Sequence, residues 1–394
     1  MMARQKRHAR HNEGSVYYAA YRNRWVAEVT TSLDQRKRHY CKTEREAIRK
    51  RNEMLRELEQ GMLATGPQRK LGEYLENWLE NVHKDKLRIS AYVKYKKQMK
   101  YIVADLGNVW LQKLTPEQVR RFYTRMGKKR EDGGMGLSSK TIHEIHGLLH
   151  LALKNAVRWG YVSRNVCDLV DPPRIVSREA TPLTLEQAQA LLKSVREHRL
   201  EMLLTMAVVT GMRRGELLAL RWSNIDLSRK TLLVLHTVDY IPNYGYVETE
   251  PKTAAGKRLV SLPPFLIDML KQHRIRQLEQ QLKQGETWEN RDLVFPDLHG
   301  GYFNPNYLLR VFKRVLSEAG IPHMHFHDLR HSAATILLSM GVNVKVIQEL
   351  LGHSDIDITL GLYSHLLPSM QQEVVDRWEG VFGHSDDETE QRGS

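Results

Sequence analysis

The sequence has few cysteines and no long hydrophobic run. Its 394 residues include only two cysteines, Cys41 and Cys167, which cannot supply a disulfide framework or a cysteine-rich zinc site. No apolar stretch approaches the roughly 18 residues that a membrane span needs. The basic first residues lack the apolar segment of a secretory signal. We therefore expect a soluble, cytoplasmic protein with no membrane partner.

Motifs of several common enzyme classes are also missing. The sequence contains no G-x-x-x-x-G-K-[ST], no G-x-G-x-x-G and no H-E-x-x-H, so the nucleotide triphosphate, dinucleotide and zincin classes have no motif support. Carboxylate pairs of the hydrolase type are absent as well. We expect neither a cofactor nor a bound metal ion.

Four histidines close together in the last third of the chain invite a metal-binding interpretation. Residues 323, 325 and 327 would align on a strand, whereas 327 and 331 would align on a helix. No single element would therefore present all four, and we rank a metal site below other roles. These histidines are His323, His325, His327 and His331.

Positive charge is in excess and is concentrated near the start. The chain has 60 Lys and Arg against 46 Asp and Glu, a formal charge of +14. Residues 1–56 hold 15 of these basic residues against 6 acidic ones. Such a region fits a nucleic-acid partner, whose phosphates would release counterions on binding. Ribosome-associated and membrane-surface proteins are equally basic, so charge alone does not decide.

Residues 1–60 predict a small sheet followed by a helix, after a disordered basic arm over residues 1–13. Short aromatic and β-branched runs predict strands at 16–21, 24–30 and 38–41, and a capping box at 43–46 predicts a helix to about residue 59. Basic residues along the hairpins are candidate DNA contacts, the alternative being a small basic fold without a specific ligand. These candidates are Arg22, Arg24, Arg36 and Lys37.

Residues 68–170 predict an all-helical domain. Apolar residues recur at helical spacing within 71–79, 92–102 and 142–157, and a second capping box begins at Thr115. Basic residues among the aromatics of the second stretch are candidate DNA contacts, although such a helix face is commonly just solvated. These candidates are Lys94 and Lys97. We interpret His143, His146 and His150 as surface histidines rather than metal ligands.

Residues 178–382 predict a mixed α+β, mainly helical domain, after a connector at 172–181. A capping box at 184–187 begins its first helix, and a strand pair is expected at 231–235 and 257–262. A terminal helix is expected at 370–381, and the acidic residues 383–394 predict a disordered tail. The fold class is thus multidomain: a three-stranded sheet with a helix, an all-α domain, and this mixed domain.

The last domain holds four stretches rich in Arg, Lys, His and Tyr. Cationic groups gathered without carboxylate pairs suit an anion, and phosphoryl transfer depends on positioning and on stabilising negative charge. Each stretch alone has a simpler explanation, such as an ion pair on a helix surface, a turn lysine or a half-buried aromatic. The stretches are 210–217 (TGMRRGEL), 251–253 (PKT), 327–331 (HDLRH) and 351–365 (LGHSDIDITLGLYSH).

Taken together in this order, the stretches resemble the tyrosine recombinase (phage integrase) family. The pattern T-G-x-R-x-x-E, P-K-T, H-x-L-R, L-G-H and a tyrosine ten residues after that last histidine is met at every position. The resemblance spans the chain. It implies an arm-type DNA-binding domain at 1–60, a SAM-like core-binding domain at 68–170 and a catalytic domain at 178–382, as in the integrase of a prophage or integrative element.

The resemblance also implies a nucleophile and its anion-binding partners. Tyr363 would attack a DNA phosphodiester, forming a 3′-phosphotyrosyl link and freeing a 5′-hydroxyl. Arg213, Arg330 and His353 would hold the non-bridging oxygens. Because an unperturbed tyrosine has a pKa of about 10, Tyr363 needs nearby cations or a base to react at neutral pH.

Three further residues complete the implied site. Lys252 would protonate the leaving 5′-oxygen, His327 would assist proton transfer around the nucleophile, and Glu216 would brace the site without touching substrate. The covalent link conserves the bond energy, so no ATP would be required, and the two arginines, the lysine and the histidines would take the place of a metal ion.

The implied partners are double-stranded DNA with core and arm attachment sites, a homotetramer on synapsed DNA, an excisionase and a DNA-bending host factor in a bacterial host. Two other functions stay open at this point. A type IB-like topoisomerase could use the same residues, and a DNA-binding regulator could keep the fold without the chemistry. A requirement for paired sites would separate the recombinase from the topoisomerase.

Overall fold

The structure is a computed structural model that describes residues 14–30, 36–59, 67–128, 135–175, 181–251 and 254–352. The chain divides into two compact units, Met1–Ser177 and Arg178–Ser394. The expected basic arm, the terminal helix at 370–381 and the acidic tail lie outside the described residues.

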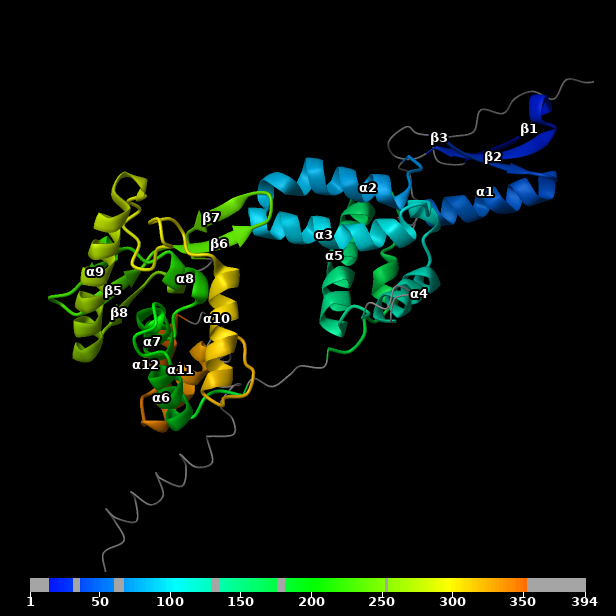
Figure 1. Ribbon diagram of the computed structural model, residues 1–394. Helices are drawn as coiled ribbons and strands as arrows, with labels where there is room; N and C mark the ends of the chain where they lie inside the picture. Colours follow the sequence, from blue (N-terminus) through cyan, green and yellow to red (C-terminus); the bar gives the residue numbers. More distant parts are fainter. Residues whose placement is uncertain are drawn as a thin grey trace, which may run out of the picture. The chain divides into compact units, whose positions relative to one another are not determined.

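The first unit begins with the expected sheet and helix (Figure 1). Strands β1 (Ser15–Ala19), β2 (Arg24–Thr30) and β3 (Arg36–Cys41) form an antiparallel sheet in the order β1-β2-β3, and α1 (Glu44–Glu59) packs on it. Ala27, Cys41 and Ala47 form a buried cluster between sheet and helix.

The first strand is shorter than predicted. It ends at Ala19, and a 3₁₀ turn, Ala20–Arg22, takes the place of its last residues. Asn23 follows with φ 50°, and its amide donates to the carbonyl of Ala20 at 3.2 Å. Asparagine tolerates this left-handed conformation better than most residues, which is why the chain reverses here.

The rest of the first unit is all-helical, as predicted. The Thr115 side chain and the Gln118 side chain cap α4 reciprocally, and the core includes Trp78, Phe122 and Leu149. The elements are α2 (Leu71–Asn77), a π-helical turn (Trp78–His83), a 3₁₀ turn (Lys84–Lys86), α3 (Ile89–Leu106), a 3₁₀ turn (Leu111–Lys113), α4 (Pro116–Gly127), α5 (Ser139–Arg158) and a 3₁₀ turn (Val166–Leu169).

The second unit is mixed and mainly helical, also as predicted. Its helices and helical turns are α6 (Leu185–Ser194), α7 (Glu201–Thr210), α8 (Arg214–Leu218), 3₁₀ turns at Trp222–Asn224, Ala254–Gly256 and Gly285–Thr287, α9 (Pro264–Gln284), α10 (Pro305–Glu318), α11 (Asp328–Ser339) and α12 (Val344–Leu351). Among these described residues no helix combines the length and the apolar composition that a membrane span requires.

The predicted strand pair of the second unit is present as β5 and β8. Strands β4 (Ile225–Asp226), β5 (Thr231–Val234) and β8 (Arg258–Ser261) form an antiparallel sheet in the order β4-β5-β8. A separate hairpin, β6 (Thr237–Ile241) and β7 (Gly245–Thr249), was not predicted.

Helix α7 lies at the centre of this unit and determines where the candidate site begins. Nearly all of its residues are buried, and it packs against α11. It ends at Gly211, whose φ of 60° favours glycine. A Cβ at Gly211 would lie only 2.3 Å from a side-chain carbon of Leu351. The C-terminal end of α7, the start of α8 and the C-terminal end of α12 therefore lie close together.

Candidate active site

Arg213 and Glu216 form a tight pair at the start of α8. Arg213 is the N-cap residue, and its guanidinium donates to Glu216 Oε1 at 2.7 Å. The backbone amide of Arg213 donates to Glu216 Oε2 at 3.0 Å. The three-residue spacing in the sequence therefore produces the contact that was expected from it.

Glu216 is buried, yet it stays ionised. Its exposed fraction is 3 %, and burial alone would raise the pKa of the carboxyl. The hydrogen bonds and charges of Arg258 and Arg213 outweigh that penalty, so the pKa lies below its ordinary value.

Arg330 connects α11 to the same place. It is 1 % exposed, and its guanidinium donates to the carbonyl of Gly211 at 3.0 Å. Because Gly211 precedes Arg213 by two residues, the two arginines from distant parts of the sequence lie at one junction of the fold. A pair of guanidinium groups in one place suits the non-bridging oxygens of a phosphodiester.

His327 is the N-cap residue of α11, and its imidazole contacts that of His331 edge to face at a centroid distance of 5.3 Å. Desolvation by neighbouring atoms, together with the positive charges of His331, Arg330 and Arg213, lowers the pKa of His327 to about 4, against a smaller opposing effect of Asp328. The imidazole of His327 is therefore neutral at pH 7 and is a weak base in the free protein.

A further arginine belongs to the cluster and was missed in the sequence. Arg258 on β8 donates from Nη2 to Glu216 Oε2 at 2.9 Å and from Nε to the carbonyl of Leu350 at 2.7 Å. Its neighbours on β8 alternate between buried and exposed, and Arg258 lies on the buried side with Val260. A charged residue at an inward position of a predicted strand was the signal available in the sequence.

The remaining implied residues, Lys252, His353 and Tyr363, lie outside the described residues. The structure does describe their chain neighbours on one side. Gly256 ends the turn that follows the P-K-T segment, and Gly352 caps α12 with φ 69° directly before His353. Of the site implied by the resemblance, the structure therefore brings together Arg213, Glu216, His327 and Arg330.

Three of the candidate DNA contacts in the first 60 residues gather on the sheet face opposite α1. Ala27 and Val29 of β2 pack against α1. Because side chains alternate along a strand, Arg24 of β2 lies on the opposite face, and so does Arg36, which pairs with Thr30. The Arg22 guanidinium stacks over the Tyr40 ring at 4.8 Å. All three arginines are exposed, so this face combines cations with aromatic rings, as nucleic-acid-binding surfaces do.

Lys37 lies on the other face. It pairs with Val29 across the sheet, and Val29 packs against Met54 of α1. Desolvation there lowers the pKa of Lys37. Lys37 therefore lies on the opposite face of the sheet from the three arginines, although all four residues were predicted together as DNA contacts.

Lys94 and Lys97 are exposed on α3. Lys94 forms an ion pair with Glu144 of α5 at 3.0 Å. The histidines of α5 take part in local contacts: His146 lies 2.8 Å from the hydroxyl of Tyr123, and His150 lies 2.8 Å from a carboxylate oxygen of Asp168. Within the described ranges no three His, Cys, Asp or Glu side chains are placed to hold a metal ion.

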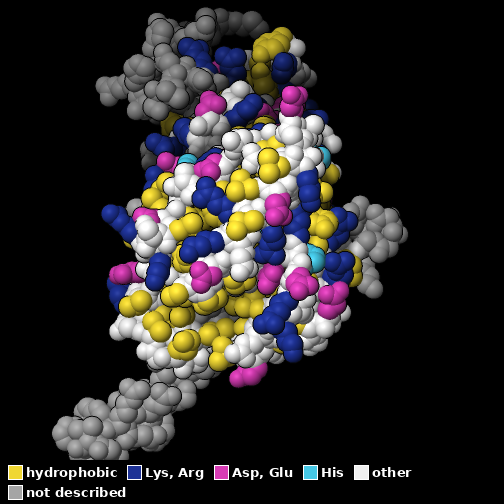
Figure 2. Space-filling model, turned by 60° about the vertical axis from the view of Figure 1, so that its left-hand side comes forward, with side chains coloured by type: hydrophobic (Ala, Val, Ile, Leu, Met, Phe, Trp, Pro, Cys, Tyr) yellow, Lys and Arg dark blue, Asp and Glu magenta, His cyan; other side chains and the backbone are white. Residues whose placement is uncertain are grey.

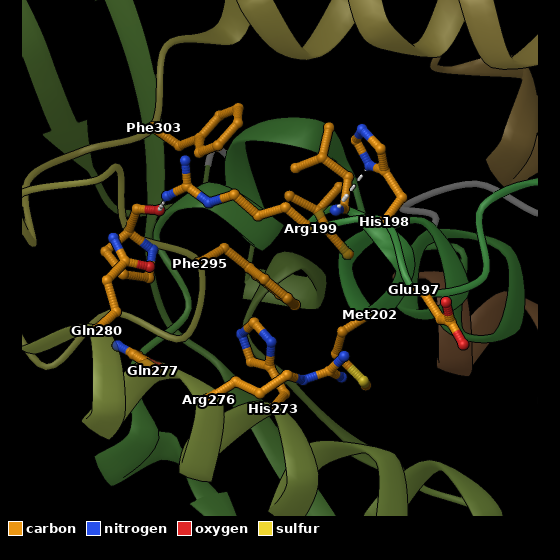
Figure 3. Close-up of a pocket in the computed structure, with 13 residues that line it drawn as sticks. Glu197, His198, Arg199, Met202, His273, Arg276, Gln277, Gln280, Phe295 and Phe303 are labelled. Atoms are coloured by element: carbon orange, nitrogen blue, oxygen red, sulfur yellow. Dashed lines mark hydrogen bonds between the residues drawn. The ribbon is translucent and has the colours of Figure 1, made fainter.

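A pocket of about 260 Å³ lies elsewhere in the second unit. Figure 3 shows Arg199 beside the ring of Phe303, with its guanidinium donating to the carbonyl of Pro296 at 3.0 Å. The half-buried ring of His273 contacts the carbonyl of Val294 at 2.8 Å. Arg199 precedes α7, whereas Arg213 follows it, and a ten-residue helix spans about 15 Å. This pocket is therefore separate from the Arg213 cluster.

Surface charge by itself does not mark a binding face on the side shown in Figure 2. Basic side chains are scattered there among acidic and hydrophobic ones, and hydrophobic side chains gather toward its lower end. The buried arginine cluster, and not the surface charge, therefore indicates the anion site.

The geometry defines a class of site: paired arginines, a buried carboxylate that braces one of them, and a neutral histidine, all within a mainly helical domain. Comparisons with known proteins agree with this class. Residues 182–370 match the phage integrase family, and residues 70–127 match the phage integrase N-terminal SAM-like domain.

Relatives match over most of the chain. A protein of Caldanaerobacter subterraneus subsp. tengcongensis described as tyrosine recombinase XerC-like is 31% identical over 366 residues, which cover 88% of this chain and 92% of the relative. An integrase of Saccharopolyspora erythraea is 26% identical and covers 96% of this chain and 99% of its own length.

Solved structures share the fold. The Tn1549 transposon integrase in complex with transposon right-end DNA has a TM-score of 0.66 at 20% identity, covering 78% of this chain and 99% of its own. A lambda integrase dimer bound to a COC′ core site has a TM-score of 0.55 at 16% identity, covering 91% and 96%. The chain belongs to the phage integrase family of tyrosine recombinases. Its activity is that of a tyrosine-type site-specific recombinase.

Proposed function

We propose that this recombinase cuts and rejoins double-stranded DNA through a 3′-phosphotyrosyl intermediate at Tyr363, integrating and excising a prophage or other mobile element at attachment sites. The observation that carries the proposal is the junction at Gly211, where Arg330 and the Arg213–Glu216 pair meet. Two guanidinium groups held there by buried partners are pre-organised for a phosphate whose negative charge spreads in the transition state.

In the proposed step, the phenolic oxygen of Tyr363 attacks a DNA phosphorus, so that a new O–P bond forms while the bond from phosphorus to the 5′-oxygen breaks. The phenol's proton passes to His327, whose imidazole becomes a stronger base when the negative charge of the bound phosphate offsets the neighbouring cations that lower its pKa. Lys252 gives a proton to the departing 5′-oxygen. Arg213, Arg330 and His353 hold the non-bridging oxygens throughout.

The phosphate remains a diester at every stage, so the reaction needs no ATP and no metal ion in this proposal. A 5′-hydroxyl from a partner strand then attacks the phosphotyrosine, restores the DNA backbone and releases Tyr363. Exchange between two DNA sites requires the second duplex to be close, which is why we propose a homotetramer on synapsed DNA.

The sheet face that carries Arg22, Arg24 and Arg36 is the proposed surface for arm-type DNA, and Lys94 and Lys97 are proposed contacts to core DNA. Lys37 remains a weaker candidate because it lies on the face that packs against α1. An excisionase and a host DNA-bending factor are proposed to set the direction of recombination in a bacterial host, where the protein acts in the cytoplasm on DNA.

The test uses a nicked duplex that carries the junction of the element's ends, cloned from the genome in which the gene lies. We expect a covalent protein–DNA band on a denaturing gel without ATP or added metal. Tyr363→Phe should abolish the band and leave DNA affinity unchanged, because one hydroxyl is removed. Tyr307→Phe, an exposed tyrosine of α10, is the control and should retain the band.

Two outcomes would contradict the proposal. Binding of the duplex without any covalent band would favour a DNA-binding regulator. Relaxation of a supercoiled plasmid that carries no paired sites would favour a type IB-like topoisomerase.

A further inference from the structure

We infer that Arg258 is a positioning residue of the active site, which joins the start of α8, the turn before β8 and the end of α12. The inference rests on the proposed function, because it assigns Arg258 a role in that reaction. Arg258 lies outside the four sequence stretches that suggested the site.

Three hydrogen bonds of Arg258 reach three different segments. Nη2 donates to Glu216 Oε2 at 2.9 Å, Nε donates to the carbonyl of Leu350 at 2.7 Å, and Nη1 lies 3.3 Å from the carbonyl of Gly256. The side chain is 5 % exposed and that of Glu216 is 2 % exposed. Water therefore has little access to these contacts, and each of them constrains the position of a segment.

Each of the three segments adjoins a residue of the proposed mechanism. Glu216 holds Arg213 directly. Gly256 follows the segment that contains Lys252, and Leu350 precedes His353 by three positions in the sequence. The guanidinium of Arg258 thus contacts chain neighbours of Arg213, Lys252 and His353.

The backbone approaches Arg258 closely at the end of α12. A Cβ placed on Gly352 would lie 2.6 Å from the carbonyl oxygen of Ala255 and 2.9 Å from Cδ of Arg258. Both distances are below normal contact, so the L-G-H segment, the 254–256 turn and Arg258 pack without spare room. A shift of Arg258 would therefore be transmitted to the residue that precedes His353.

Charge gives a second reason for an arginine here. Glu216 alone would neutralise Arg213, and the pair would then have little attraction for a phosphate. With Arg258 as a second cation on the buried carboxylate, the three groups together carry one net positive charge. Since the Arg213 side chain is 40 % exposed while that of Arg258 is 5 % exposed, the excess charge faces outward at Arg213.

A lysine could not reproduce this arrangement. Its ammonium is a single point on a flexible stem, whereas the guanidinium presents donors in a rigid plane. In Arg258→Lys we expect the ammonium to pair with Glu216 and lose the carbonyl of Leu350. The buried charge would stay compensated, but the end of α12 would no longer be tied to Glu216.

The experiment measures three quantities for each variant of the full chain: the single-turnover rate of covalent cleavage of the nicked duplex, affinity for the same duplex by gel shift, and the thermal unfolding midpoint. For Arg258→Lys we expect a midpoint and an affinity close to those of the unmodified chain. We expect the cleavage rate to fall about 100-fold, the size of effect that a misplaced catalytic group produces.

Arg199→Lys is the matched control. Arg199 also donates to a backbone carbonyl of the second unit, that of Pro296 at 3.0 Å, and stacks on Phe303. It lies at the other end of α7 from Arg213. Its replacement should change the thermal midpoint as much as Arg258→Lys does and leave the cleavage rate unchanged.

A double-variant comparison tests whether Arg258 acts through Glu216. In a Glu216→Gln background Arg258 has no buried carboxylate to neutralise and to hold in place. Arg258→Lys should therefore reduce the cleavage rate by a much smaller factor in this background than it does alone. Equal factors in the two backgrounds would contradict the inference.

Other results would also overturn it. Cleavage by Arg258→Lys at the rate of the unmodified chain would show that Arg258 does not position the site. Loss of the folded state in Arg258→Lys, seen as an absent thermal transition, would make Arg258 a residue of general stability. If the unmodified chain forms no covalent complex, the proposed function fails instead, and that result is distinguishable because no variant is needed to obtain it.

Discussion

The carboxylate of Glu216 remains ionised in a buried position because two guanidinium groups surround it. One of these partners could be predicted, since Arg213 lies three residues away at the start of a helix. The sequence could mark Arg258 as an inward-facing charge of a predicted strand, but not its pairing with Glu216, because the two residues are 42 positions apart and the register of the strand is fixed only when the sheet forms. At the scale of single residues, spacing along the sequence predicted the contact between Arg213 and Glu216 but not the contact between Arg258 and Glu216.

His327 gives a prediction at the same scale. Desolvation and neighbouring positive charge lower its pKa to about 4, so in the free protein its imidazole should still be neutral at pH 6. NMR titration of the ring resonances, assigned with His327→Gln, should give a midpoint near 4. A midpoint near the ordinary value of about 6.5 would contradict the described environment.

The lowered pKa also fixes the sign of a stability effect. The unfolded chain binds a proton at His327 below about pH 6.5, whereas the folded chain does so only near pH 4. The free energy of unfolding therefore decreases as the pH falls through that window. His327→Gln should reduce this decrease, as measured by urea unfolding at pH 7 and pH 5.

At the scale of elements, strands and helices with clear periodicity or caps could be predicted. The strands of the first sheet, the capped helix α4 and the β5–β8 pair appear at or close to their expected positions. The β6–β7 hairpin could not, because all five residues of β7 are half-buried and neither of its faces is distinctly apolar. The sequence also did not predict which face of the first sheet packs against α1, and this packing determines the surroundings of Lys37.

Substitution of the exposed arginines of the first sheet tests whether this face binds DNA. Arg24→Ala combined with Arg36→Ala should weaken binding to DNA that carries the repeats flanking the crossover site. The slope of log affinity against log salt should become less steep by about 2, since each phosphate contact contributes about 0.9. Fluorescence anisotropy over a range of salt concentrations measures both quantities.

Lys37→Ala is the control for this measurement, because it removes one positive charge from the opposite face of the same sheet. We expect it to leave the salt slope nearly unchanged. A loss of affinity from Lys37→Ala as large as that from the two arginines would show that DNA does not bind the proposed face.

At the scale of the whole molecule, the site is assembled from α8, β8 and the consecutive helices α11 and α12, three parts that are far apart in the sequence. The order of the motifs suggested the family, but the contacts depend on α7 being buried at the centre of the second unit and on Gly211 allowing the close approach of Leu351. Such approaches arise from packing between elements, which periodicity does not report. The second unit therefore contains the arginine cluster within a core of its own.

In the proposed function, residues 1–60 bind arm-type DNA and the second unit cleaves core DNA, and a deletion can separate the two roles. Deletion of residues 1–60 should reduce recombination between sites that carry flanking arm sequences far more than it reduces covalent cleavage of a core duplex. The first sheet and α1 have their own small cores, distinct from that of the second unit, so the reaction centre should stay folded. Equal losses in the two assays would contradict separate roles.

The most direct test of the central claim is to locate the DNA on the protein. Trypsin should release residues 346–377 from the covalent complex, a peptide in which Tyr363 is the sole tyrosine alongside Ser354, Ser364 and Ser369. Mass spectrometry of nuclease-trimmed complexes is predicted to find a 3′-linked nucleotide on Tyr363. A nucleotide on one of the serines, or on another peptide, would contradict the account.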